Sequence, residues 1–242
     1  MPTRSAIALV VTAFLLTVLI RLPATLLTRF LPHEVACEDP SGTLWAGTCG
    51  ELRSGELALS GLHWTLHPLS LLGARAVLDL HSDDPRAAGR AQVTLRFNGD
   101  AQIQALSALL PLQDGLSVLP KGWNGSIALS IARARIEDRR LAAIEGTVTA
   151  QQLSSTRPSL DLGSLQLEFP PAASGAPLGT LRDLGGPLSL QGHVRLTPDG
   201  GFELEATVAA RDPGNTNLQQ LLQMLGPANA QGAHELSLSG SF

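Results

Sequence analysis

The sequence contains little charge and few aromatic residues. Among its 242 residues there is no tyrosine and only one lysine, charged residues make up 16%, and aromatic residues make up 4%. Soluble domains usually have about 25% charged residues, so serine, threonine, glutamine and glycine must supply much of the polar surface. The net charge is -4, and no basic tract is available to neutralise phosphates. We therefore expect no nucleic-acid partner.

Signatures of the common enzyme classes are also missing from the sequence. There is no P-loop, no G-x-S-x-G element, no H-E-x-x-H pair and no dinucleotide-binding fingerprint. His63 and His67 would share one face of a strand, on which every two residues span about 6.5 Å, so the two imidazoles would lie too far apart to bind one metal ion easily. The run from His81 to Asp84 combines a histidine, a serine and two acids, but consecutive residues do not converge as a triad does, so we expect a turn. The sequence predicts no catalytic, metal or cofactor site, and therefore no enzyme.

Long apolar runs are scarce, and the first one lies at the N-terminus. Residues 6–20 read AIALVVTAFLLTVLI without a charge. At about 1.5 Å per residue this run is shorter than a hydrocarbon core of about 30 Å, so it fits either a cleaved signal peptide or part of a longer anchor. No convincing A-x-A cleavage site follows, and residues 22–31 continue apolar apart from Arg29. We expect an uncleaved transmembrane anchor and juxtamembrane segment over residues 5–31.

The two cysteines bear on the compartment. Cys37 and Cys49 close a short loop with proline and glycine in it, which suits a disulfide. A bond closing such a loop contributes about 3 kcal/mol in the chain-entropy model, and it persists only in an oxidising space. The alternative is a pair of reduced, buried cysteines in a cytosolic chain. With the disulfide, residues 32–242 would be a periplasmic domain and residues 1–4 a cytoplasmic tail.

Beyond the anchor, apolar and polar residues alternate with the period of a β-strand. The alternation is clear from Ala91 to Asn98, from Leu188 to Thr197, from Phe202 to Ala210 and from Leu236 to Phe242. Turn sequences rich in glycine, proline and aspartate separate these runs. One apolar and one polar face predict a mainly β body, built as a curved antiparallel sheet of hairpins.

Two segments have helical periodicity instead. Residues 216–225 place leucines at i, i+3, i+4 and i+7 after Asn215, which predicts a short amphipathic helix. Residues 101–110 repeat this pattern more weakly and end before a proline, so we expect a second short helix there. Residues 170–187, rich in glycine, proline and alanine, predict a flexible connection, either within one body or between two halves of the sheet.

Two tryptophan elements resemble a known family. The first is Gly42-Thr43-Leu44-Trp45-Ala46-Gly47, and the second is Leu62-His63-Trp64-Thr65-Leu66-His67-Pro68. Together they resemble protein N of the bacterial type II secretion system, whose members contain G-T-[LV]-W-x-G followed by L-x-W-x-L-x-P. The positions that carry the resemblance are Gly42, Leu44, Trp45, Gly47, Leu62, Trp64, Leu66 and Pro68. The segments from Leu218 to Gly226 and from Gly232 to Gly240 also resemble the end of that family.

The resemblance implies a non-enzymatic accessory subunit of type II secretion that aids export of folded proteins across the outer membrane. It implies a single-pass bacterial inner-membrane protein with a periplasmic β-rich domain, contacts with inner-membrane or secretin components, and no cofactor. Glycines would allow a tight turn, Trp45 would pack into the sheet, and the disulfide would pin the first strand to the membrane-proximal segment. We expect partners to bind at exposed sheet edges.

An alternative function belongs to a different class. A curved sheet with one apolar face and an inner-membrane anchor also resembles the AsmA-like envelope proteins, whose grooves hold lipid. A continuous apolar concave face would favour this alternative. A face plugged by the two expected helices would favour a plain scaffold, and periodicity alone does not separate the two.

Overall fold

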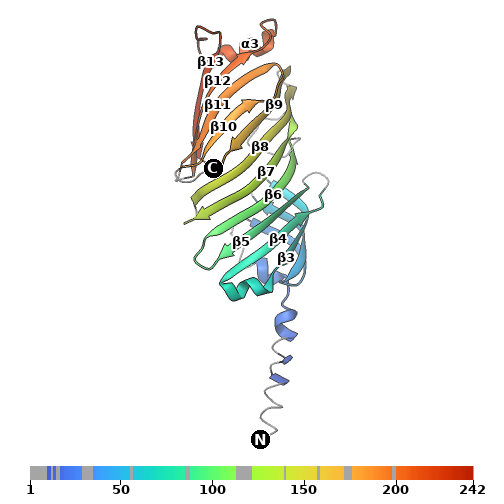
Figure 1. Ribbon diagram of the computed structural model, residues 1–242. Helices are drawn as coiled ribbons and strands as arrows, with labels where there is room; N and C mark the ends of the chain where they lie inside the picture. Colours follow the sequence, from blue (N-terminus) through green and yellow to red (C-terminus); the bar gives the residue numbers. More distant parts are fainter. Residues whose placement is uncertain are drawn as a thin grey trace.

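The computed structural model contains one large antiparallel sheet. It describes residues 10–11, 13–14, 17–28, 35–54, 57–84, 88–112, 122–138, 140–156, 159–171, 176–197 and 200–241. The order of the thirteen strands in space is their order in the sequence, so each strand from β2 to β12 lies between its two sequence neighbours, and β1 and β13 form the edges. Figure 1 shows an elongated, curved sheet with the N-terminal helical turns at one end and the helix α3 at the other.

The elements have the following bounds. The strands are β1 (Val35–Gly42), β2 (Ala46–Ser54), β3 (Leu57–Leu66), β4 (Arg75–Ser82), β5 (Gly89–Arg96), β6 (Ala101–Pro111), β7 (Trp123–Glu137), β8 (Arg140–Thr156), β9 (Ser159–Phe169), β10 (Leu178–Asp183), β11 (Leu188–Leu196), β12 (Gly201–Ala210) and β13 (His234–Ser241). The helices are α2 (Thr25–Thr28), the 3-10 helix η1 (Pro68–Gly73) and α3 (Thr216–Gln223). Within the ranges given above, none of the helices is both long enough and apolar enough to cross a membrane. The predicted anchor over 5–31 lies partly outside those ranges, and the predicted tail 1–4 lies wholly outside them.

The sheet has one apolar and one polar face, as the alternation predicts. Cross-strand partners share a face, so the register traces the apolar face from strand to strand. One member per strand from β3 to β13 is Trp64, Leu80, Val93, Ile103, Leu129, Val148, Leu167, Leu181, Leu190, Val208 and Leu236. Burial is one-sided, because Trp64, Phe169 and Val208 on this face are 5%, 4% and 3% exposed, whereas Arg182 and Glu205 on the opposite, outer face are exposed.

Residues 101–110 form most of strand β6, so the helix predicted there is wrong. Ala105 has a φ of 49°, and the pairing of β5 with β6 shifts by one residue at this point, which marks a β-bulge. The extra residue shifts the alternation of β6 by one. As a result Ile103 and Leu106 both lie on the apolar face, paired with Ala134 and Ile131 of β7. A strand with a bulge thus imitates the i, i+3 spacing of a helix.

Strand β10 lies inside the segment 170–187, which the sequence predicted to be a flexible connection. A Cβ on Gly179 would lie 2.8 Å from atoms of both Leu167 and Phe169, so this glycine allows large side chains of β9 to pack over β10. Because β10 pairs with both β9 and β11, the sheet continues through this segment.

Helix α3 covers the apolar face at its C-terminal end, and the helix predicted over 216–225 is confirmed. The side chain of Asn215 accepts a hydrogen bond from the N–H of Leu218 at 3.1 Å, which satisfies a free donor of the first turn. Leu218 and Leu222 are 0% and 2% exposed. They pack against Leu188, Leu190 and Val208 of the sheet.

Candidate functional site

The two tryptophan elements meet at the N-terminal end of the sheet. Gly47 of β2 and Trp64 of β3 are cross-strand partners. A Cβ on Gly47 would lie 2.4 Å from an atom of the Trp64 ring, so glycine is what allows the indole to cover β2. The indole Nε1 of Trp64 donates a hydrogen bond to the carbonyl oxygen of Leu44 at 3.3 Å. We call the eight positions that carry the family resemblance, together with the two cysteines, the motif node.

Trp45 connects the motif node to the N-terminal segment. It lies half-buried in the turn between β1 and β2. This differs from the expectation, based on the sequence, that Trp45 packs into the sheet. Its Nε1 donates a hydrogen bond to the carbonyl oxygen of Leu19 at 2.8 Å. The N–H of Leu44 donates to the carbonyl oxygen of Leu22 at 2.8 Å, and the N–H of Leu66 donates to that of Trp45 at 2.7 Å. Trp45 therefore joins the N-terminal segment, the first turn and the end of β3.

Cys37 and Cys49 form a disulfide bond, as the sequence predicted. Cys37 lies in β1 and Cys49 in β2, and Cys49 is 1% exposed beside Trp64 and Ala24. The covalent bond therefore joins two neighbouring strands, and does not join the first strand to the N-terminal segment as expected, although Cys49 packs against Ala24 of that segment. The backbone hydrogen bond of Leu44 and the indole hydrogen bond of Trp45 make that second connection.

The other motif positions have backbone or packing roles. Gly42 has a φ of 90°, and a Cβ there would lie 2.7 Å from the carbonyl oxygen of Ala46, so the turn into β2 requires glycine. Leu62 and Leu66 flank Trp64 on the apolar face, with the period of a strand. Pro68 stands in the first turn of η1, where its missing N–H leaves no hydrogen bond unmade.

Histidines and an acid gather on the outer face near the same end. His63 Nε2 and His81 Nε2 lie 3.4 and 2.5 Å from carboxylate oxygens of Asp83, and all three side chains are exposed. His81 and Ser82 end strand β4, so the turn predicted from His81 to Asp84 is only partly correct. Ser82 is buried on the apolar face and His81 lies on the outer face, so the two do not converge. In the part of the chain that the structure describes, no group of three or more histidine, cysteine, aspartate or glutamate side chains is arranged so that it could hold a metal ion.

Asp79, also on the outer face, is held by two neighbours. Gln92 Nε2 donates a hydrogen bond to one carboxylate oxygen at 2.8 Å, and His67 Nε2 lies 2.6 Å from the other. These contacts, first that of Gln92 and then that of His67, lower the pKa of Asp79 below its ordinary value. The group links β4, β5 and the residue before η1, which is a structural role.

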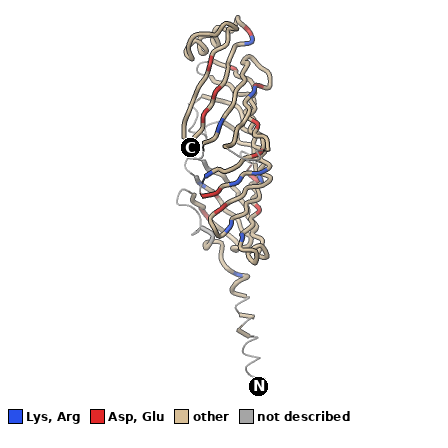
Figure 2. Tube along the Cα trace, turned by 60° about the vertical axis from the view of Figure 1, so that its left-hand side comes forward, with Lys and Arg blue, Asp and Glu red and all other residues tan. Residues whose placement is uncertain are grey.

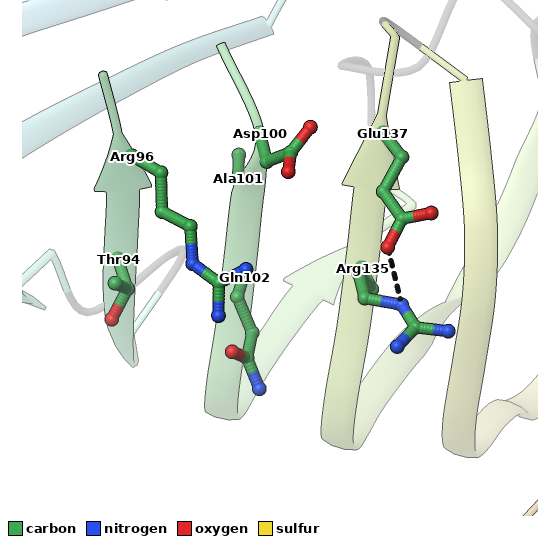
Figure 3. Close-up of a pocket in the computed structure, with 7 residues that line it drawn as sticks. All are labelled: Thr94, Arg96, Asp100, Ala101, Gln102, Arg135 and Glu137. Carbon is green, nitrogen blue, oxygen red and sulfur yellow. Dashed lines mark ion pairs between the residues drawn. The ribbon is translucent and has the colours of Figure 1, made fainter. Parts of the chain in front are cut away.

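A small hollow on the outer face offers no room for an organic ligand. Figure 3 shows it between β5, β6 and β7, where Arg96, Gln102, Arg135 and Glu137 are among its lining residues. Arg135 Nε and a carboxylate oxygen of Glu137 form an ion pair at 3.1 Å. The space is about 10 Å³, comparable to one water molecule.

The apolar face runs along the whole sheet from β3 to β13. The motif node closes it at one end and α3 at the other, while Val93, Ile103, Leu129 and Val148 on the central strands stay partly exposed. At about 4.8 Å per strand, thirteen strands give the face a length of roughly 60 Å. The candidate functional surfaces are therefore the motif node and the apolar face.

Comparisons with known proteins agree on one family. The family model described as type II secretion system (T2SS), protein N, matches residues 33–237. A type II secretion system protein N of Pectobacterium carotovorum subsp. carotovorum is 27% identical over 228 residues, which cover 90% of this chain and 89% of that protein. Proteins of the same name match from Vibrio cholerae, at 24% identity over 96% of this chain and 95% of that protein, and from Aeromonas hydrophila, at 37% over 39% and 38%. No solved structure matches the chain. The matched residues include the motif node and α3.

Proposed function

The chain belongs to the type II secretion system protein N family, and from this we propose that it is a non-enzymatic accessory subunit of type II secretion. It aids export of folded proteins across the outer membrane, in contact with inner-membrane or secretin components of the machine. The observation that carries the proposal is the family match over residues 33–237, which contains both tryptophan elements. In this chain, the contacts of Gly47, Trp45 and Trp64 give the glycine and the two tryptophans a structural role at these positions.

The proposed subunit has one membrane anchor and a periplasmic body. An uncharged apolar run over residues 6–20 precedes the sheet, and the motif node holds Leu19 and Leu22 by hydrogen bonds. The disulfide suits an oxidising compartment. These features support an anchor over 5–31 and a periplasmic domain over 32–242 of a single-pass inner-membrane protein.

Secretion in a host that lacks only this chain tests the function. We expect secreted hydrolases to accumulate in the periplasm of that host, and the wild-type chain to restore their release into the medium. Trp45→Phe keeps an aromatic ring but loses the donor to Leu19, so it should restore secretion less well than Trp123→Phe, a matched change in β7. Normal secretion without the chain would show that the proposal is wrong.

A second candidate function is binding of lipid acyl chains along the apolar face. The observation that favours it is the continuity of this face from β3 to β13 and its partial exposure in the centre. Of the two helices expected to plug the face, the one at 101–110 is a strand of the sheet itself. An acyl chain is a suitable occupant, because the N-terminal segment at one end of the face is itself apolar enough to contact lipid.

Lipid extraction from the purified chain tests this second candidate. We expect phospholipid to co-purify with the full chain from inner membranes in a mild detergent. Val148→Asp places a charge on the apolar face and should reduce the bound lipid, whereas Thr149→Asp on the outer face of the same strand should not. Equal lipid in both variants, or none in the wild type, would rule out the groove.

A further inference from the structure

The sheet has two edges, and the β1 edge is protected against pairing. Pro40 in β1 has no N–H to donate, and Asp39 has a φ of 53°, which interrupts the regular strand. Helix α2 lies against this strand, and Thr43 just beyond it pairs with Pro23. Proline, an irregular backbone and a covering segment are the usual means by which proteins block an edge strand.

Among the residues that the structure describes, none gives the β13 edge a protection of this kind. The strand reads HELSLSGS over His234–Ser241, with no proline and no residue at positive φ. Its register with β12 is unbroken over the whole strand, and it is the last strand in the order of the described sheet. Leu238, on the apolar side of this edge, is 51% exposed. A regular, uncovered edge strand of this kind is a template for another strand.

The outward backbone groups of β13 can be identified from the register. The N–H of Thr197 donates to the carbonyl oxygen of Gly201 where β12 begins, so odd-numbered residues of β12 bond to β11. Bonded and non-bonded pairs alternate in an antiparallel ladder, so even-numbered residues of β12 bond to β13, where their partners are also even-numbered. The N–H and C=O groups left pointing outward belong to Glu235, Ser237, Ser239 and Ser241.

The outer face beside this edge is acidic and hollowed. Glu205 and Glu235 line an open hollow of about 650 Å³ there, together with the polar side chains of Gln191, Thr207 and Ser237. His193 also lines it, and the basic group Arg195 lies 3.9 Å from Glu203, which partly neutralises it. Figure 2 shows acidic positions on the strands close to the C-terminus. A lysine or arginine of a neighbouring strand would find carboxylates here.

We propose that β13 is where an extended β-strand of another secretion subunit adds to the sheet. The side chains of this partner strand on the apolar face of the sheet are apolar and cover Leu236 and Leu238. Its side chains on the outer face are basic and lie opposite Glu235. This inference rests on the proposed function, because it takes the partner from the secretion machinery. A second copy of this chain fits less well, because pairing β13 with β13 would bring two acidic outer faces together, and the β1 edge of a second copy is blocked.

Proline substitution on the edge tests the proposal. Ser237→Pro and Ser239→Pro each remove an outward N–H while leaving the bonds to β12 unchanged, and Ser237→Ala is the matched control that keeps the N–H. The probes are the purified periplasmic domains of each inner-membrane and secretin subunit from the same host, added to the full chain in detergent. We expect one domain to bind the wild type and Ser237→Ala equally and both proline variants at least about tenfold more weakly. Glu235→Arg should weaken the same complex.

Other outcomes would overturn the proposal. Binding that the proline substitutions do not weaken would place the contact elsewhere on the chain. If none of the domains bound the chain, the proposed partner among the secretion subunits would be ruled out. Self-association that Ser237→Pro abolishes would assign the edge to a second copy. Melting curves must show that the proline variants are folded. If one of them were unfolded, the other proline variant and Glu235→Arg would decide. Secretion by the host lacking the chain tests the proposed function separately, so the two ideas can fail independently.

Discussion

The two ends of the apolar face are closed by different means. At the N-terminal end, Trp45 and Trp64 donate hydrogen bonds to backbone carbonyls of other segments, and a disulfide joins β1 to β2. At the C-terminal end, Leu218 and Leu222 of α3 are buried against aliphatic side chains. The motif positions all lie at the N-terminal end. Specific residues are needed where three separate segments must be joined, whereas an amphipathic helix of ordinary composition suffices at the other end.

Removing the indole at the motif node should have the largest effect on stability. Trp64 is 5% exposed, so we expect Trp64→Ala to lower the free energy of unfolding by about 4 kcal/mol through lost burial and a cavity. Trp123→Ala is the control, because Trp123 at the start of β7 is only partly buried and should lose clearly less. Urea denaturation measures both. Equal losses would contradict the view that the motif node is a special closure.

Shortening a buried leucine side chain of α3, at the other end of the apolar face, should have a smaller and more local effect on stability. Leu218 is 0% exposed, and we expect Leu218→Ala to cost about 3 kcal/mol. Leu225→Ala, at a position that is 40% exposed, should cost less than about 1 kcal/mol. Hydrogen exchange should rise in β11 and β12 and stay unchanged in β2 and β3. A rise at both ends would mean that the two closures are coupled.

The sequence predicted the C-terminal end better than the rest of the fold. The strands at β11 and β12 and the helix α3 follow from local periodicity, because each has one face buried and no irregularity. Strand β6 was missed because the bulge at Ala105 changes the period, and β10 was missed because Gly179 serves packing in a strand. Bulges and glycines of this kind depend on neighbouring strands, which local patterns do not contain.

At the motif node, sequence reasoning found the residues but not their contacts. The family resemblance identified Gly47 and Trp64, and the short loop between cysteines predicted the disulfide. Their meeting depends on the register of β2 against β3, which places a glycine opposite an indole. The hydrogen bond from Trp45 to Leu19 spans 26 residues and has no local signal. A glycine two residues after a tryptophan could have indicated close packing, but not its partner.

The carboxylate of Asp183 contributes to the stability of the C-terminal end of the sheet. Its side chain is 7% exposed at the end of β10. Burial alone would raise the pKa of Asp183, but hydrogen bonds from the N–H groups of Leu190 and Gly185 and the contact with Arg211 outweigh burial and lower it. We expect Asp183→Asn to cost about 2 kcal/mol at neutral pH.

The pH dependence of that loss follows from the direction of the shift. A lowered pKa stabilises the folded state above the ordinary value of about 4, and this contribution disappears as the pH falls through the lower value of the folded state. The difference between wild type and Asp183→Asn should therefore shrink below about pH 4. Glu205→Gln, at an exposed position, is the control and should change stability little. A difference that stays constant down to acid pH would show that the carboxylate charge is not involved.

Threonine substitution compares the centre of the apolar face with its covered end. Val208 is 3% exposed under α3, and Val148 is partly exposed on β8, so the same change buries a hydroxyl at one site and leaves it in reach of water at the other. We expect Val208→Thr to cost about 2 kcal/mol and Val148→Thr less than about 1 kcal/mol in urea denaturation of delipidated protein.

The small effect at Val148 also separates the two candidate functions. If acyl chains fill the central part of the face, a hydroxyl there loses its water, and the cost of Val148→Thr in protein purified with native lipid should rise toward that of Val208→Thr. If the face is only the inner side of a scaffold, the cost should be the same with and without lipid. Val208→Thr is the internal control, because α3 covers that site in both preparations. A rise at Val208 as well would mean that lipid changes the stability of the whole sheet and does not occupy its centre.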